Sequence, residues 1–294
     1  MAIIGVQHIG VAVRDYHRAV EQFRTLFGLQ TQDFRDNQGP TQHDGRILLG
    51  NGCWLHVVHN WNPQSRVAQF VERHGEGLEH IALLSDDIFA DVRRVSDAGV
   101  PFFGGRVFRA PDGWEAFVYP EYNNGVTVEL IQPHRTSWQY PAASGPLSPT
   151  TGIVQLQHIG LAVNDCRAAC QRFEELFGLR AQDFRTDQNG TDQVDARILL
   201  GNRCWLHVVE NKNPQRRVNQ FIQKHGEGIE HIALQTTSIE ADVAHLKSVG
   251  VSVFQDRIFN APDGFETFIY PDSTPGVTVE LIQPHATSWA WKPA

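Results

Sequence analysis

The feature that most constrains this chain is an internal repeat that covers nearly all of it. Residues 6–13 return as residues 156–163, and residues 53–58 return as residues 204–209. Residues 74–83 and 126–134 return in the same way, as residues 225–234 and 277–285. Two halves with matched sequences are expected to fold alike, so the chain is predicted to contain two similar domains.

A fainter repeat lies inside each half, because residues 7–11 resemble residues 79–83. Each of these two segments reads as a strand and precedes a predicted helix with an acidic start and a glycine stop. The helices are expected at 15–27, ending at Gly28, and at 87–98, ending at Gly99. Short strands separated by turn residues follow each helix, which predicts a βαβββ module.

Four such modules fit the chain, at about 3–60, 78–133, 154–211 and 229–284. One module has too little core to be stable alone, so the modules are expected to pair. The predicted fold class is therefore α+β, with four modules paired into two tandem domains that each hold a metal-binding cleft. The expected boundaries are 1–134 for the first domain, 135–152 for a linker rich in Pro, Ser, Ala and Gly, and 153–294 for the second domain.

Composition excludes several classes of protein. Hydrophobic residues make up 41% and charged residues 20%, which is typical of a packed globular chain. The net charge is −8 and the basic residues form no run, so a nucleic-acid partner is not expected. No apolar stretch approaches a membrane span, and the N-terminus lacks the pattern of a signal peptide, which predicts a cytoplasmic protein without a membrane partner. The four cysteines are expected to be reduced packing residues.

Each half presents one matched set of histidine and glutamate residues on its predicted strands. Imidazole and carboxylate together suit Zn, Fe, Co, Ni or Mn as a divalent cofactor. Side chains alternate between the faces of a strand, so a strand-borne histidine and glutamate can point into one cleft. A carboxylate inside an apolar strand also needs a partner or a metal ion. The predicted metal ligands are His8, His56, His80 and Glu129 in the first half, and His158, His207, His231 and Glu280 in the second.

These residues resemble the vicinal oxygen chelate (glyoxalase/extradiol dioxygenase) superfamily, whose sheets surround a divalent metal. Within it, the segment 75–82 and the hairpin with Phe117, Gly125 and Glu129 are most similar to methylmalonyl-CoA epimerase. The tandem four-module chain is also similar to cyclitol (2-epi-5-epi-valiolone) epimerase. The resemblance implies that His8, His80 and Glu129 are metal ligands, and likewise His158, His231 and Glu280. The family often has Gln or Glu where this chain has His56 and His207.

For several residues that recur in both halves, two interpretations stay open. His56 and His207 are metal ligands or acid/base groups. Glu115 and Glu266 follow predicted turns and act as general bases or are solvated hairpin carboxylates. Arg46 and Arg197 bind a substrate anion or cover the sheet edge. Trp54 and Trp205 are predicted to point away from the fourth-position histidines and to pack in the core. Glu129 and Glu280 are candidate bases as well as ligands.

The predicted activity is that of a metal-dependent epimerase or isomerase. A small hydroxyketone-like, oxygen-rich substrate would chelate the metal, and a base would remove the proton next to its carbonyl. A non-haem Fe(II) extradiol-type dioxygenase is the main alternative, because two histidines and one carboxylate form the iron facial triad. A glyoxalase-type lyase and a non-catalytic binding protein of the same fold are further alternatives. A homodimer is compatible with a chain of this size.

Overall fold

A computed structural model describes residues 3–36, 41–111, 113–134, 147–186 and 192–285 of the chain. The elements of the first half are β1 (Ile3–Ala12), α1 (Tyr16–Phe27), β2 (Thr31–Asp36), β3 (Gln42–Leu48), β4 (Trp54–Asn60), α2 (Arg66–His74), β5 (Gly77–Ser85), α3 (Ile88–Asp97), η1 (Phe103–Gly105), β6 (Phe108–Arg109), β7 (Gly113–Val118), η2 (Pro120–Tyr122) and β8 (Thr127–Pro133). Those of the second half are β9 (Ile153–Ala162), α4 (Cys166–Phe177), β10 (Ala181–Thr186), β11 (Gln193–Leu199), β12 (Trp205–Asn211), α5 (Arg217–His225), β13 (Gly228–Thr236), α6 (Ile239–Ser248), η3 (Phe254–Asp256), β14 (Phe259–Ala261), β15 (Gly264–Ile269), η4 (Pro271–Ser273) and β16 (Thr278–Pro284).

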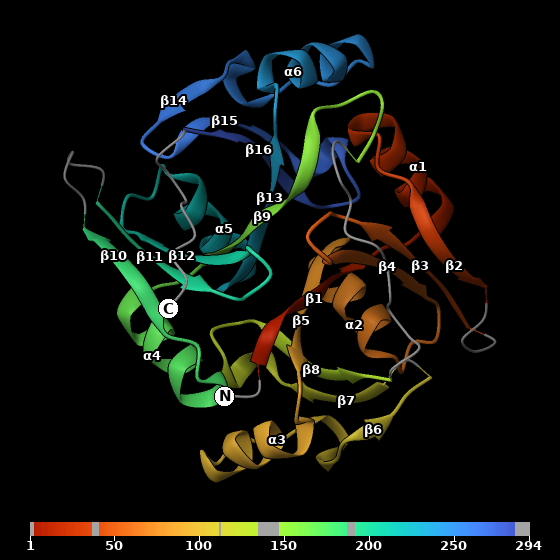
Figure 1. Ribbon diagram of the computed structural model, residues 1–294, viewed down its shortest axis with the longest axis vertical. Coiled ribbons are helices and arrows are strands. Elements are labelled where there is room, and N and C mark those ends of the chain that lie inside the picture. Colours follow the sequence, from red (N-terminus) through yellow and green to blue (C-terminus); the bar gives the residue numbers. More distant parts are fainter. Residues whose placement is uncertain (1–2, 37–40, 112, 135–146, 187–191, 286–294) are drawn as a thin grey trace. The chain divides into compact units, whose positions relative to one another are not determined.

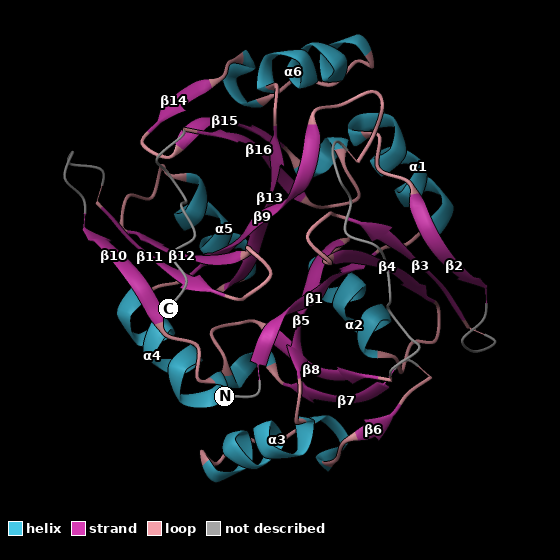
Figure 2. Cartoon of the chain, in the orientation of Figure 1, coloured by secondary structure: helices cyan, strands magenta, loops and turns pink. Residues whose placement is uncertain are grey.

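Each half forms one curled, mixed sheet of eight strands (Figure 2). The strand order is β2-β3-β4-β1-β5-β8-β7-β6 in the first sheet and β10-β11-β12-β9-β13-β16-β15-β14 in the second. The outer hairpins are antiparallel, whereas β5 pairs with β8, and β12 with β9, in parallel. The predicted α+β fold of four βαβββ modules, paired into two eight-stranded sheets, is therefore confirmed.

Helix α1 shows why the predicted helices form where they do. The Asp15 carboxylate caps its N-terminus by accepting a hydrogen bond from the Arg18 backbone N–H at 3.0 Å. Gly28 ends the helix in the left-handed conformation, with φ 67°, where a side chain would be strained. Ala19, Phe23 and Phe27 are fully buried. The helix begins one residue later than predicted, because Asp15 is its cap.

Helices α2 and α5 are absent from the four-module prediction. In the first half, Val67 and Val71 of α2 pack against Ala12 of β1 and Val58 of β4, on the side of β2–β4 opposite to α1 (Figure 1). Val67, Phe70 and Val71 follow the i, i+3, i+4 spacing of an amphipathic helix, which is the signal that could have identified it. The helix covers one part of the inner face of the curled sheet.

The described residues also divide into two compact units that take segments from both halves. One unit is Met1–Ile9, Glu79–Pro141 and His158–Glu230, and the other is Gly10–Leu78, Ala142–Gln157 and His231–Ala294. The predicted domain boundaries therefore stay a prediction, and residues 135–146 of the predicted linker lie outside the described residues.

Each unit contains a hydrogen bond between an asparagine of a turn and the first strand of the other half. In the first unit, Asn202 donates to the Val6 carbonyl at 2.9 Å and accepts from the Val6 N–H at 3.2 Å. In the second unit, Asn51 donates to the Leu156 carbonyl at 3.0 Å. Asn51 and Asn202 occupy matching positions, so the same contact is made once in each unit.

Two further features concern the described residues as a whole. None of their helices is long and apolar enough to cross a membrane. The side chains of Cys53, Cys166, Cys170 and Cys204 are all buried and form no disulfide.

Candidate metal centre

The four predicted site residues of each half lie on four strands that are neighbours in the sheet. His56 is on β4, His8 on β1, His80 on β5 and Glu129 on β8, and these strands are adjacent in that order. In the second half, β12, β9, β13 and β16 carry His207, His158, His231 and Glu280 in the same way. Central strands are rigid supports, so they hold these side chains more precisely than loops would.

In the first half, three of these side chains converge on one point. His8 Nε2 lies 2.9 Å from His80 Nε2, and Glu129 Oε2 lies 3.3 Å from the first nitrogen and 3.2 Å from the second. The three side chains are almost completely buried. His56 lies close by, because one ring nitrogen from each of His8, His56 and His80 falls within 4.8 Å of the others.

The second half repeats the arrangement. His231 Nε2 lies 3.2 Å from Glu280 Oε2. Ligand atoms of His158, His231 and Glu280 lie within 4.8 Å of one another, and all three residues are buried. The ring of His207 contacts that of His158, with their centroids 5.3 Å apart. The structure thus brings together the residues predicted for each set.

The outer nitrogen of each candidate ligand histidine in the first half, Nδ1 of His8 and of His80, is hydrogen-bonded. His80 Nδ1 lies 2.6 Å from Glu79 Oε2, and His8 Nδ1 contacts Gln7 Oε1. A carboxylate or amide oxygen can only accept, so both Nδ1 atoms carry the proton and donate it. Each Nε2 then presents a lone pair toward the other at 2.9 Å.

This geometry fits a divalent metal ion. Two inward lone pairs and a carboxylate oxygen repel one another unless a cation lies between them. The two Nε2 atoms are 2.9 Å apart, close enough for both to bind one ion. Two imidazoles and one carboxylate are ligands that suit Zn, Fe, Co, Ni or Mn.

The electrostatics of Glu129 agree with an ionised ligand. Burial raises the pKa of this carboxyl, but the positive charge and hydrogen bonds of protonated His8 and His80 outweigh burial and hold the pKa well below the usual range. A cation bound between the two imidazoles would keep Glu129 ionised in the same way.

The fourth-position histidines have a carboxylate partner on the neighbouring strand. His56 Nε2 lies 3.3 Å from Asp44 Oδ2, and His207 Nε2 lies 3.2 Å from Asp195 Oδ2. Burial raises the pKa of Asp44, but the hydrogen bond and charge of His56 outweigh it, so the pKa is lower than usual. The pKa of Asp195 is lowered by His207 in the same way.

Asp44 and Asp195 were not predicted as site residues. They stand at matching positions inside two strands, and a repeated carboxylate within a buried strand is the signal that could have identified them. Because their oxygens hold the Nε2 atoms of His56 and His207, these two imidazoles are oriented differently from the ligand histidines.

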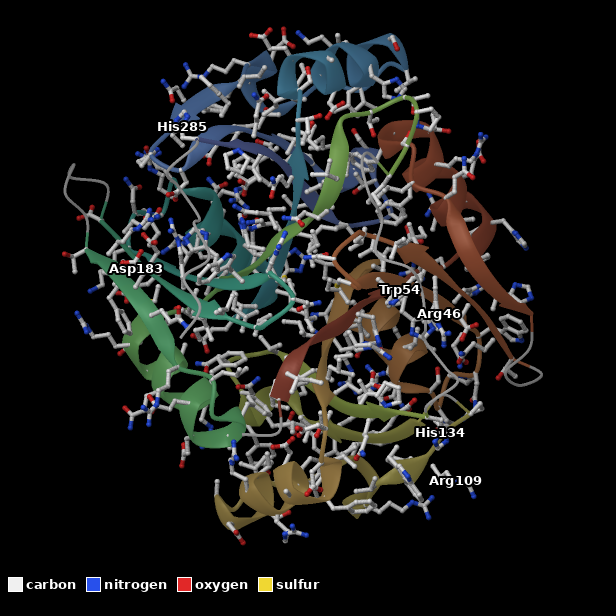
Figure 3. All side chains as sticks on the ribbon, viewed as in Figure 1. Arg46, Trp54, Arg109, His134, Asp183 and His285 are labelled. Carbon is white, nitrogen blue, oxygen red and sulfur yellow. The ribbon has the colours of Figure 1, made fainter. Side chains whose placement is uncertain are left out.

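Arg46 and Trp54 lie on the same face of the sheet as His56. Arg46 is directly opposite His56, and Leu48 is directly opposite Trp54, in the β3–β4 ladder. Figure 3 labels Arg46 and Trp54, which come from these two neighbouring strands. The predicted opposite orientation of Trp54 is wrong, because Trp54 and His56 are two residues apart and a strand has a period of two. The same register places Trp205 on the face of His207. Both indoles are buried, as a packing role requires.

The remaining predicted residues are Glu115, Glu266 and Arg197. Phe117 is opposite Glu129, and alternation places Glu115 on the same face, two residues along β7. Glu266 has the matching position on β15. Arg197 is buried, with its Nη1 3.7 Å from Asp183 Oδ2, so the sheet-edge contact exists in the second half.

Comparison with known proteins identifies the family. A family model described as the glyoxalase/bleomycin resistance protein/dioxygenase superfamily matches residues 7–119 and 157–270. The chain belongs to this superfamily, and each half carries one copy of the match.

Two curated relatives cover parts of the chain. An uncharacterized protein of Bacillus subtilis, YqjC, is 27% identical over 131 residues, which are 44% of this chain and 92% of YqjC. The 4-hydroxyphenylpyruvate dioxygenase of Pseudomonas aeruginosa is 54% identical over 39 residues, which are only 13% of this chain and 11% of that enzyme.

Solved structures share the fold. A mutant of 4-hydroxymandelate synthase from Streptomyces coelicolor has a TM-score of 0.73 at 18% identity, with 97% of this chain and 94% of that chain covered. Methylmalonyl-CoA epimerase from Mycobacterium tuberculosis matches one half, with a TM-score of 0.43 at 22% identity and coverage of 46% and 91%. The match of the family model confirms, at the level of the superfamily, the resemblance that the site residues indicated.

Proposed function

We propose that the protein is a divalent-metal-dependent isomerase or epimerase that moves a proton next to a carbonyl group. The observation that carries the proposal is a histidine–aspartate pair beside each candidate metal triad. Such a pair supplies an acid/base group, and the triad supplies a place for a Lewis acid, which are the two parts that this chemistry needs.

The first-half triad would be His8, His80 and Glu129, and the second-half triad His158, His231 and Glu280. A bound divalent ion supplies Lewis acidity, which stabilises negative charge that develops on a chelated substrate oxygen. Both imidazoles of the first triad are oriented by their outer hydrogen bonds, so their positions are set before substrate arrives.

His56 is the proposed base of the first half. Its side chain keeps 18% exposure, against 3–4% for the triad histidines, so a substrate can reach it. The Asp44 carboxylate holds Nε2 and stabilises the imidazolium that forms when the ring accepts a proton at Nδ1. Protonation of the substrate carbon on its other face by a second acid, for which Glu115 is the candidate, inverts the centre, and His56 then releases its proton to solvent.

The proposed substrate is a small hydroxyketone with neighbouring oxygens. Arg46 is directly opposite His56 on the same face of the sheet, so its positive charge favours an anionic substituent on that substrate. Glu115 remains a second candidate for proton transfer, because it lies on the face of Glu129.

The experiment is proton–deuterium exchange at the α-carbon of a hydroxyketone panel in D₂O, followed by NMR with the Co²⁺-loaded protein. His56→Gln together with His207→Gln should reduce exchange by about 10²–10⁴-fold, the range typical of a lost general base. The same variant should retain its metal ions. Loss of metal in this variant would make His56 and His207 ligands instead, and absence of exchange with every hydroxyketone would overturn the proposal.

An iron-dependent dioxygenase is the second candidate. The two-histidine, one-carboxylate set is favourable for it, and the short segment shared with 4-hydroxyphenylpyruvate dioxygenase points the same way. Oxygen uptake with catechols or aromatic 2-oxo acids under Fe²⁺ loading distinguishes the two, since an isomerase consumes no oxygen.

A further inference from the structure

We propose that the residue immediately before each ligand histidine is a positioning residue that sets the tautomer and aim of that imidazole. The pairs are Gln7–His8 and Glu79–His80 in the first half, and Gln157–His158 and Glu230–His231 in the second. The inference rests on the metal site of the proposed function, and not on the reaction that the site catalyses.

The first-half contacts carry the argument. Glu79 Oε2 lies 2.6 Å from His80 Nδ1, and Gln7 Oε1 contacts His8 Nδ1. All four side chains are at least 95% buried, so water does not compete for these hydrogen bonds. Each acceptor keeps the proton on Nδ1 and leaves the Nε2 lone pair directed at the other imidazole, 2.9 Å away.

The cost of Gln7 supports a role beyond packing. Its Nε2 is buried and has no hydrogen-bond partner among the described residues. An unsatisfied buried amide costs about 1–3 kcal/mol, so an apolar side chain would be the better core residue at this position. What Gln7 provides in return is the hydrogen bond that its Oε1 accepts from His8 Nδ1.

The same residue types recur in the second half. Gln157 and Glu230 directly precede His158 and His231, and both are buried. Arg217 Nη1 donates to Glu230 Oε2, so a cation helps to keep this carboxylate ionised and in place. One amide and one carboxylate therefore accompany each pair of ligand histidines.

The test is Co²⁺ affinity, measured one site at a time by competition with a chromophoric chelator. In the His80→Ala background the second site alone binds, and Gln157→Leu is expected to weaken Co²⁺ binding by about 10–100-fold. Gln157→Glu, which keeps an acceptor, is expected to restore most of the affinity. In the His231→Ala background, Gln7→Leu and Glu79→Leu should have the corresponding effect on the first site.

Gln155→Leu is the matched control, because Gln155 lies on the same strand as Gln157 and its side chain is hydrogen-bonded to Gln235 rather than to a histidine. This control should change the Co²⁺ affinity by less than about 2-fold, well below the change expected for Gln157→Leu. Equal affinities of the Gln157→Leu and Gln155→Leu variants would overturn the proposal while leaving the metal site intact. Absence of Co²⁺ binding by the unmodified chain would instead overturn the metal site and this inference together.

A second measurement does not depend on the folding of any variant. Long-range ¹H–¹⁵N NMR of the metal-free, unmodified chain reports which ring nitrogen of each histidine carries the proton. We expect His8 and His80 to be protonated on Nδ1 at neutral pH. Protonation on Nε2 in both residues would overturn the proposal even if the variants lost affinity.

Discussion

At the scale of single residues, histidines of the same chain differ in role because their partners differ. His8 and His80 bond outward through Nδ1 and face each other through Nε2. His56 instead forms a hydrogen bond through Nε2 with the buried carboxylate of Asp44. The ring of His59, outside the site, contacts those of His43 and Trp61, with centroids 6.4 Å and 5.3 Å away.

His59 leads to a prediction on pH. Burial lowers its pKa, the charge of His43 lowers it further, and Asp15 and Glu76 only partly oppose this. A histidine with a depressed folded pKa contributes stability that is present above its unfolded pKa of about 6.5 and is lost as the pH falls through the folded value.

His59→Gln should therefore reduce the loss of stability between pH 7 and pH 5. Urea unfolding of the metal-free protein at several pH values measures this. Glu210→Gln, at the matching position of the second half, is the control and should not change the slope in that window. An unchanged slope for His59→Gln would contradict the prediction.

Gly125 carries a second residue-scale prediction. Its φ is 73°, and an added Cβ would collide with the Glu227 carbonyl oxygen in the same unit. Gly125→Ala should cost about 1–3 kcal/mol or more, because left-handed strain and the collision add. Gly52→Ala has a similar φ of 76° with open space around it, so it measures the strain alone. Urea unfolding of the two variants should show the larger loss for Gly125→Ala.

At the scale of elements, helices α2 and α5 occupy matching positions in the two halves but differ in their N-terminal caps. Ser65 caps α2 by accepting a hydrogen bond from the Ala68 N–H at 3.1 Å. The corresponding Arg216 of α5 provides no side-chain cap. Both helices still form, because apolar side chains such as Val67 and Val218 bury against the inner face of their sheets.

Arg216→Ser should stabilise the protein by about 1 kcal/mol, and Ser65→Ala should destabilise it by a similar amount. Thermal unfolding with excess EDTA measures both without a contribution from bound metal. A destabilised Arg216→Ser variant would show that the arginine makes a contact worth more than the cap.

At the scale of the whole molecule, duplication has kept a full set of site residues in each half. Two metal ions per chain are therefore expected after purification without chelators. His80→Ala should leave one ion per chain, and His80→Ala with His231→Ala should leave none. Elemental analysis of the purified proteins measures the content, and one ion in the unmodified chain would show that only one set binds.

Bound metal should also stabilise the fold, because an ion that binds only the native state shifts the equilibrium by mass action. EDTA is expected to lower the Tm of the unmodified chain and to leave that of the double variant nearly unchanged. An equal shift in both proteins would indicate that EDTA acts elsewhere than at these sites.

The sequence by itself determined the repeat, the βαβββ modules and the bounds of α1 and α3 to within one residue, and it predicted the candidate metal ligands. Those features depend on short-range signals, such as the Asp15 cap and the Gly28 stop, or on residue types that recur at matching positions. Side-chain chemistry alone indicated a metal for His8, His80 and Glu129, because few other partners stabilise a carboxylate inside an apolar strand.

Only the tertiary structure decided how these residues act. The pairing of His56 with Asp44 depends on the register of β3 against β4, which no local pattern specifies. The convergence of His8, His80 and Glu129 depends on the order of β1, β5 and β8 in the curled sheet. Helix α2 also depends on the tertiary structure. Its apolar side chains are buried only when the folded sheet brings Ala12 and Val58 against them.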